Sequence, residues 1–366
     1  MTARKLDLPG FLYALIWLMR DTIRQAMASG LFLVMMFITL LATLFCFGLG
    51  VQGDVPLKRN SNLPTYFLPD PTKQQFVQAA TMVALDPLPA AAVAVYAVKN
   101  DPDFIANRYD VETVRGKVTL AFGALVIPLT RDRSSIAEYV QLLLAGWVAD
   151  TAGILLALVW TAGFLPTFLE PSAASVLMAK PLPRWGLLLG KYLGVVCFVL
   201  FQATLFVSLT WLAIAIKLGV WDLRYLLCIP LLVLHFAIFF SFSVLLAVTT
   251  RSTVACVIGS IAFWLLCWAM NFGRHAFWLT PELQQGGSGM LAFLVEAGYW
   301  IVPKPADLGL VLFDALKAED YFGRVLDVKK LDEMGRFQPE LSIPASLLAT
   351  AGLLVLASIQ LEDNDY

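Results

Sequence analysis

The sequence has few charged side chains and almost no histidine. Asp, Glu, Lys and Arg make up 14% of the 366 residues, and there are 2 histidines. A soluble domain needs more polar residues than this to cover its surface. The formal net charge of -1 leaves no basic surface for nucleic acid, because neutralising phosphates requires clustered Lys and Arg. A soluble domain and a nucleic-acid-binding protein are therefore excluded.

Motifs for metal, disulfide and nucleotide chemistry are also missing. The sequence holds no H-E-x-x-H pair and no nucleophile elbow. A nucleotide-binding loop needs G-x-x-x-x-G-K-[ST], but the glycine spacing before Lys191 is one residue short and Tyr192 replaces the hydroxyl. We therefore expect no metal, cofactor or nucleotide on this chain. Free cysteine in an apolar run behaves as a small hydrophobe, and all the cysteines lie in such runs: Cys46, Cys197, Cys228, Cys256 and Cys267.

Long apolar segments dominate instead. Hydrophobic residues make up 59% of the chain, and about 20 helical residues cross the hydrocarbon core of a membrane. Six segments meet this requirement: residues 29–51, 139–163, 186–216, 226–248, 254–272 and 344–359. The sequence therefore predicts an all-α polytopic membrane protein with six transmembrane helices and both termini on one side.

The distribution of Lys and Arg in short loops sets the orientation, because positive charge is retained in the cytoplasm. The only short loop on one side carries Lys217 and Arg224. The short segments on the other side carry more positive charge: Arg4, Lys5, Arg20, Arg24, Lys180, Arg184 and Arg251. Both termini are therefore predicted to be cytoplasmic.

The spans divide the chain into five regions. They are 1–51, with an interfacial helix and the first span; 52–138, an extracytoplasmic insertion; 139–272, with spans two to five; 273–342, an extracytoplasmic segment; and 343–366, with the sixth span and a cytoplasmic tail. The interfacial helix is predicted from an apolar stripe over residues 11–27, with Arg20 and Arg24 on another face. A cleaved signal peptide is the alternative, because Arg4, Lys5 and the "AMA" at 26–28 resemble its parts.

Both external regions are predicted to contain structure. In the insertion we expect a helix at 74–85 and extended runs at 92–98 and 111–130, which together predict a small α/β subdomain. Residues 290–302 and 305–317 form two apolar segments too short to cross a membrane. We expect these two to form an interfacial or re-entrant helical hairpin.

The start of the third span combines glycines with charged and aromatic residues. Small residues at four-residue spacing let a neighbouring helix backbone approach closely, although glycine is also common in membrane helices in general. Long basic side chains can reach back to lipid headgroups, and Trp and Tyr favour the interface. We therefore assign helix packing and interface anchoring to Trp185, Gly186, Gly190, Lys191, Tyr192 and Gly194.

A short helix is predicted between the second and third spans. Pro171 suits a first helical turn, and Glu170 before it favours the positive end of the helix dipole. Pro181 disfavours a helical Lys180, so the helix ends by residue 179. A short, proline-bounded helix outside the bilayer is suited to docking into another protein.

These residues resemble the signature of bacterial ABC-2 type permeases, including the permease of the nitrous-oxide-reductase maturation group. The residues that carry the resemblance are Glu170, Lys180-Pro181, Pro183-Arg184-Trp185 and Gly190-Lys191-Tyr192-Leu193-Gly194, with a further similar segment, "TTRSTVACV", at 249–257. The Gly-Thr pair usual after the glutamate is replaced by Pro171 and Ser172-Ala173, and the external segment after the first span is longer than in the simplest members.

The resemblance implies a coupling helix at 170–179 that contacts a separate ABC ATPase. ATP and Mg²⁺ would be bound on that partner, and the permease would pair with a second permease chain, as a homodimer or a heterodimer. The implied location is the bacterial cytoplasmic (inner) membrane, in contact with membrane lipids, and the usual direction is export. The coupling residues are then Glu170, Pro171, Ser172, Ser175, Leu177, Met178, Lys180 and Arg184.

Polar residues inside the predicted spans are candidates for a translocation path. A charge at mid-helix costs about 2.5–3.5 kcal/mol on insertion scales, so it usually faces a partner or a cavity. Asp150 and His235 fall at similar depth, and we expect them to pair or to line one polar pocket with Gln202. A structural role for both remains the alternative. In the resembled family the second and fifth spans line the path, which adds Trp264, Trp268 and Asn271, with an interfacial aromatic belt as the other reading.

Three functions compete. The first is a permease subunit that dimerises and couples to an ATPase. The second is a membrane-embedded enzyme using Asp150 and His235, which lacks a second buried carboxylate and a recognisable catalytic motif. The third is a non-transporting permease homologue that relays ATPase motion to an extracytoplasmic partner through residues 52–138. We favour the first and expect the chain itself not to be an enzyme.

Overall fold

The computed structural model describes residues 8–52, 117–128, 133–169, 183–280, 289–316 and 338–363, together with isolated positions at 282 and within 330–335. By contacts the chain divides into two compact units. The larger unit comprises Met1–Thr39, Gln141–Ser208 and Leu223–Tyr366, and the smaller comprises Leu40–Val140 and Leu209–Asp222.

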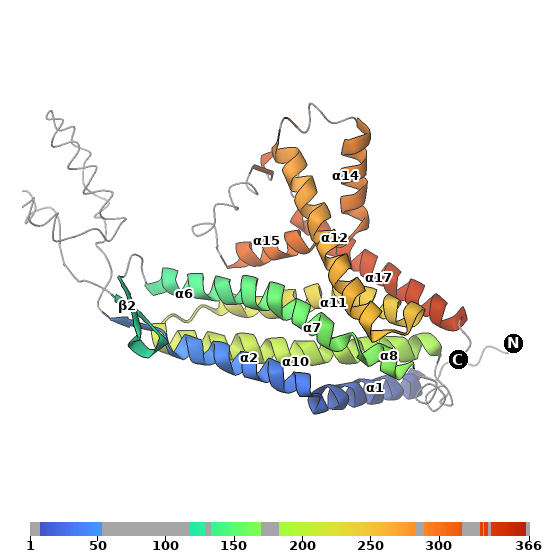
Figure 1. Ribbon diagram of the computed structural model, residues 1–366, viewed down its shortest axis with the longest axis horizontal. Coiled ribbons are helices and arrows are strands. Elements are labelled where there is room, and N and C mark those ends of the chain that lie inside the picture. Colours follow the sequence, from blue (N-terminus) through green and yellow to red (C-terminus); the bar gives the residue numbers. More distant parts are fainter. Residues whose placement is uncertain are drawn as a thin grey trace, which may run out of the picture. The chain divides into compact units, whose positions relative to one another are not determined.

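Helices make up most of the described chain. In sequence order they are α1 (Leu8–Ala28), α2 (Gly30–Phe47), α6 (Arg133–Leu142), the π-helix η2 (Leu143–Gly153), α7 (Ile154–Thr161), α8 (Phe164–Phe168), α10 (Arg184–Leu218), the 3-10 turn η3 (Leu223–Leu227), α11 (Cys228–Thr250), α12 (Thr253–Leu279), α14 (Gly289–Ile301), α15 (Pro305–Ala315) and α17 (Pro339–Asp363). Figure 1 shows them coloured along the sequence.

Five of these helical stretches are long and apolar enough to cross a membrane: Ile136–Phe168, Arg184–Leu218, Leu223–Thr250, Thr253–Leu279 and Leu341–Asp363. A sixth results if the segments Tyr13–Ala28 and Phe32–Phe47, whose axes differ by 70°, count as one broken span. A protein with this many apolar helices is embedded in a membrane. Five of the six predicted spans are thus confirmed as long apolar helices, and the first is part of the bent pair.

The bend between α1 and α2 is held by a small aromatic cluster. Trp160 packs edge-on against Phe198, with ring centroids 4.8 Å apart, and Ala26 completes the buried centre. The Trp160 indole donates to Ser29 Oγ at the bend, 3.1 Å away, and Ser29 Oγ donates to the Ala26 carbonyl. These contacts hold the bend between α1 and α2 against the second and third spans. An interfacial position of α1 stays a prediction.

Helix α11 forms the centre of the larger unit. It is apolar on all sides, as expected of a helix buried within a bundle, and a larger share of it is buried than of the other apolar spans. It contacts α17, α12 and α7. Helix α14 lies beside α12, and α15 contacts η2 of the second span (Figure 1). The predicted hairpin segments are therefore helical, within two residues of their expected ends.

Two predicted helix boundaries are wrong. The fifth span was expected to end at residue 272, but α12 continues to Leu279 and buries Arg274 and His275. The sixth span was expected to begin at Pro344. The helix begins instead at Pro339, which occupies the first-turn position, and Pro344 lies inside it.

The smaller unit contains a three-stranded antiparallel sheet in the order β1-β2-β3. Its strands are β1 (Gly50–Gln52), β2 (Lys117–Leu120) and β3 (Leu125–Pro128), with Gly50 opposite Thr119 and Lys117 opposite Pro128. The predicted extended run at 111–130 therefore contains two paired strands. The helix expected at 74–85 and the extended run at 92–98 lie outside the described residues.

Candidate functional site

The first candidate site is the hydrogen-bonded pair of Asp150 and His235, which the sequence places at one depth. Asp150 Oδ1 lies 2.6 Å from His235 Nδ1, with the side chains 15% and 2% exposed. The His235 ring packs against Phe239 at 5.3 Å. Among the residues that the structure describes, His235 Nε2 has no hydrogen-bond partner. The pair joins the second span to α11 and leaves one ring nitrogen available.

Asp150 lies in an unusual stretch of backbone. Residues Leu143–Gly153 form a π-helix of 11 residues, and such helices are rare and often occur at functional sites. Helix α15 packs directly against this segment: a Cβ added to Gly146 would lie 2.6 Å from Phe313 Cε1. A Cβ added to Gly309 of α15 would lie 3.6 Å from Asp150 Oδ2. The two glycines thus let α15 approach the pair closely.

A second aspartate on α15 anchors a buried polar cluster that the sequence analysis missed. Asp307 is fully buried, and its Oδ2 accepts hydrogen bonds from Ser342 Oγ, at 2.7 Å, and from the Tyr299 hydroxyl. Its Oδ1 lies 3.2 Å from His275 Nε2, an ion pair when the imidazole is protonated. This cluster ties α12, α14, α15 and α17 together.

Two cations complete the cluster. Lys304 is fully buried, and its ammonium lies 4.9 Å from the ring centroids of both Tyr299 and Trp300. The Arg274 guanidinium lies over Tyr299 at 4.0 Å, and Arg274 Nε contacts Glu296 Oε1 at 3.1 Å. A cation over an aromatic face gains from the ring quadrupole, more so where water is excluded. Such contacts and the nearby carboxylates allow two positive charges to be buried here.

The pKa values of three side chains in this cluster are shifted. Burial by itself raises the pKa of Asp307, but the nearby His275 imidazole and the hydrogen bonds from Tyr299 and Ser342 together lower it below its ordinary value. Burial lowers the pKa of Lys304, partly offset by the charge of Asp307. Burial also raises the pKa of Tyr299, and the charge of Asp307 raises it further. The cluster therefore favours an ionised Asp307 beside a neutral Tyr299 hydroxyl.

The start of α10 packs closely on α1. A Cβ added to Gly190 would lie 2.9 Å from Leu18 Cδ1, and one added to Gly194 would lie 2.8 Å from Thr22 Cβ. Gly186 of the same repeat is buried. The glycine face predicted to meet a neighbouring helix thus meets α1, and a side chain at Gly190 or Gly194 would force Leu18 or Thr22 to shift.

We expect Gly194→Ala to destabilise the protein by about 1–3 kcal/mol, because the added methyl group would overlap Thr22 and the Met19 backbone. Gly273→Ala is the matched control: that helical glycine has nothing within 4 Å of the new Cβ, so alanine should gain up to about 1 kcal/mol from helix propensity. Thermal unfolding in detergent measures both. Equal effects of the two substitutions would contradict this packing.

Two anchoring predictions are corrected. Lys191 does not reach toward the headgroups: it is 3% exposed, and its Nζ lies 3.5 Å from Asp21 Oδ2 and donates to Gln25 Oε1 at 3.1 Å. Tyr192 is buried as well and donates from its hydroxyl to the Ala237 carbonyl, at 2.9 Å. Lys191 has its polar partners on α1, and Tyr192 has its partner on α11. Neither side chain therefore needs the membrane interface for its hydrogen bonds. Trp185 remains exposed.

Arg184 has partners within the chain. Its Nη1 donates to the carbonyls of Leu361 and Glu362, each at 3.2 Å, at the C-terminal end of α17. A cation there is favoured by the helix dipole. The other residues assigned to ATPase coupling lie outside the described residues: Glu170, Pro171, Ser172, Ser175, Leu177, Met178 and Lys180.

The remaining path candidates are not all brought to the Asp150–His235 pair. Gln202 donates from Nε2 to Thr39 Oγ1 at 3.0 Å and belongs to a separate apolar cavity. Asn271 is buried and donates to the Pro303 carbonyl, which fastens α12 to the hairpin. Trp268 stacks on Phe272 with ring centroids 5.4 Å apart, and Trp264 is half-buried.

Comparisons with known proteins give no match: no protein-family model fits the sequence, and no curated protein is significantly similar to it. Within the part of the chain that the structure describes, no three or more His, Cys, Asp or Glu side chains gather as metal ligands.

Proposed function

We propose that the chain is the membrane-spanning permease subunit of an ABC transporter of the ABC-2 type. It would work as a dimer with a second permease chain, in the bacterial cytoplasmic membrane, and would export a substrate. A separate ABC ATPase would bind ATP and Mg²⁺. The chain itself would not be an enzyme, and its part would be to convert nucleotide-driven motion into rearrangement of its spans.

The observation that carries this proposal is the way the start of α10 is fastened. Lys191, Gly190 and Gly194 attach it to α1, and Arg184 attaches it to the end of α17. Residues 170–182 lead directly into this junction. A movement of that segment caused by a partner would therefore be transmitted to α1 and α17 through short polar contacts and close packing. This arrangement suits coupling to a separate motor.

The position of the Asp150–His235 pair suggests where the spans would rearrange. It links the second span to α11 beside the close contact of α15 with the π-helix. π-Helical segments inside α-helices frequently occur at functional sites. We infer that the second span rearranges at η2 when the ATPase closes, and that the contact between Asp150 and His235 governs that rearrangement.

Charge reversal in the coupling segment tests the proposal. The permease is co-expressed with the ATPase from the same genome. Glu170→Lys should then uncouple the permease from the ATPase and lower permease-stimulated ATP hydrolysis about 5- to 150-fold, which corresponds to typical coupling free energies. Lys217→Glu, at the exposed opposite end of α10, is the control and should leave hydrolysis unchanged. Hydrolysis that is insensitive to Glu170→Lys would count against a coupling role for residues 170–179.

A further inference from the structure

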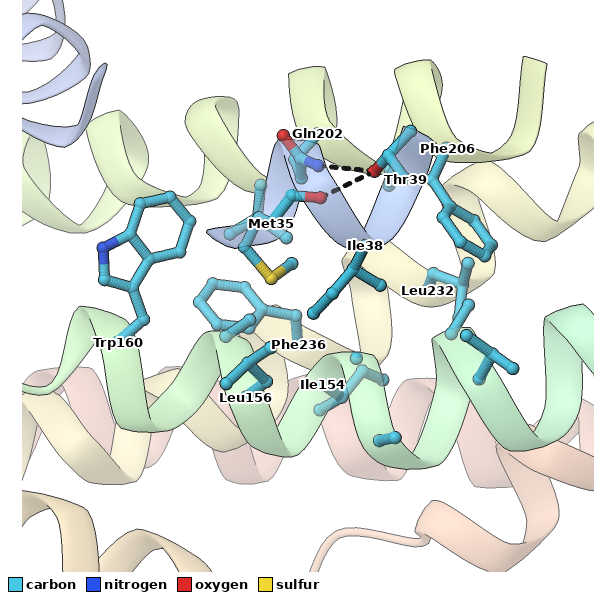
Figure 2. A pocket seen from close by; sticks show the side chains of 17 residues that line it. Met35, Ile38, Thr39, Ile154, Leu156, Trp160, Gln202, Phe206, Leu232 and Phe236 are labelled. Atoms are coloured by element: carbon cyan, nitrogen blue, oxygen red, sulfur yellow. Dashed lines mark hydrogen bonds between the residues drawn. The ribbon is translucent and has the colours of Figure 1, made fainter. Parts of the chain in front are cut away.

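The apolar cavity beside Gln202 is a half-open crevice between α2 and the second span. Its volume is about 130 Å³. In Figure 2, Met35 and Ile38 of α2 point toward the second span, which carries Ile154 and Leu156. The other walls belong to α10 and α11. An apolar cavity of about 150 Å³ can hold a benzene molecule, so the crevice has room for an apolar group of similar size.

The crevice opens at the side of the helix bundle and ends at α11. Of its lining residues, Ala152 of the second span is exposed, and Met35 and Ile38 of α2 are half-buried. Leu232 and Phe236 of α11 are only 4% and 0% exposed. The opening therefore lies between α2 and the second span, and the floor is the helix that is buried most.

The opening lies within the membrane-spanning part of both helices. Thr39 is near the middle of α2, and Ala152 is near the middle of the apolar stretch Ile136–Phe168. Exposed apolar side chains are close in sequence on both helices, such as Phe37 and Trp147. The core of a bilayer contains no water. In the membrane, the groups at this opening are therefore the acyl chains of lipids.

The polar side chains of the lining, all of which the structure describes, leave no hydrogen bond for an occupant. Gln202 Nε2 donates to Thr39 Oγ1 at 3.0 Å, and Thr39 Oγ1 donates to the Met35 carbonyl at 2.9 Å. The Trp160 indole donates to Ser29, and the Gln202 carbonyl oxygen is inaccessible. A buried water needs two to four polar partners, and a lipid headgroup would lose its hydrogen bonds here. The crevice therefore favours a purely apolar occupant.

We propose that the crevice binds one acyl chain of a membrane lipid, which enters between α2 and the second span and ends against Phe236. An empty space would forfeit the dispersion contacts of its walls, and lipid chains are the apolar groups most abundant at the opening. The site does not depend on the transport function, since it rests on the crevice and on membrane embedding. The space is left open by small residues of the second span: Ala149, Ala152, Gly153 and Ala157.

Photolabelling of the full chain in lipid nanodiscs tests the site. The probe is a phosphatidylcholine with a diazirine at the middle of one acyl chain, and mass spectrometry locates the labelled residues after irradiation. We expect label on Leu232 and Phe236, which are too buried for a lipid outside the crevice to reach. Val244 is equally buried on α11 but does not line the crevice, so it should carry none. A phosphatidylglycerol probe with the same chain should label equally, because the crevice does not contact the headgroup.

Two substitutions locate the label. Ala152→Phe narrows the opening and should lower the label on Leu232 and Phe236 roughly ten-fold, the usual scale of an overpacking penalty. Ala203→Leu fills the crevice from α10 and should have the same effect. Ala351→Phe, at an exposed position of α17 outside the crevice, is the matched control and should leave the label unchanged. Melting temperatures show which variants are folded.

Three results would overturn the site. A wild-type chain without label on Leu232 and Phe236 would show that the crevice is closed to lipid, as it would be if a second copy of the chain covered the opening. Label that persists in folded Ala152→Phe and Ala203→Leu would place the acyl chain elsewhere. Label that differs between the two probes would show that the headgroup, and not the chain, is recognised.

Discussion

Replacing Asp307 by alanine should lower the free energy of unfolding by about 3–5 kcal/mol, the cost of removing one partner from a buried ionic contact. The substitution removes the acceptor of Tyr299 and Ser342, and it removes the negative charge that partly offsets the burial of Lys304. Chemical denaturation in detergent measures the loss. Asp363→Ala, at the exposed end of α17, is the control and should change stability by less than about 0.5 kcal/mol.

The pH dependence of the same residue gives an independent check. Because the folded state lowers the pKa of Asp307, its stabilisation is fully present above the unfolded value of about 3.9. It is lost as the pH falls below that value through the folded pKa. The wild-type chain should therefore lose stability below about pH 4 by more than Asp307→Asn does. An Asp307→Ala variant as stable as Asp363→Ala would show that the cluster does not hold the hairpin.

Replacing Asp150 by asparagine should leave the protein folded and assembled but should lower ATP-driven activity about 5- to 150-fold, the range of coupling free energies of 1–3 kcal/mol. Asparagine keeps the shape of the side chain but replaces the carboxylate that contacts His235 by a neutral amide. The second span would then hold α11 less strongly beside the π-helix. The measurement is ATP hydrolysis and transport by the reconstituted complex.

A double substitution tests whether the two side chains act as one pair. Asp150→Asn and His235→Gln should together cost no more activity than either alone, because each breaks the same contact. Ser260→Ala, at a buried hydroxyl of α12, is the control and should change neither stability nor activity. If Asp150→Asn leaves assembly and activity unchanged, the pair has no part in the mechanism.

Most of the helical architecture could be predicted from the sequence, because a membrane span must be long and apolar. The depth of Asp150 and His235 follows from the same counting, since each residue advances a helix by about 1.5 Å. The close approach at Gly190 and Gly194 follows from their spacing. What these signals do not contain is the identity of the neighbour: that α1 supplies Asp21 to Lys191 depends on how the helices pack.

The buried cluster of the hairpin was missed for the same reason. Arg274 and His275 look like the polar end of a span when read alone, and their burial requires Glu296 and Asp307 from other helices. A signal was present, because Lys304 and Asp307 are charged residues in an otherwise apolar hairpin. The π-helix was not predicted from the sequence either, and Phe313 of α15 contacts Gly146 within it.

The permease proposal rests on a partner, so isolating that partner tests it most directly. The tagged chain would be extracted from its native membrane in a mild detergent, and the proteins that elute with it in constant ratio would be identified by mass spectrometry. The proposal predicts an ABC ATPase with Walker motifs, bound with the permease dimer and lost from Glu170→Lys. A folded chain that elutes with no ATPase would contradict it.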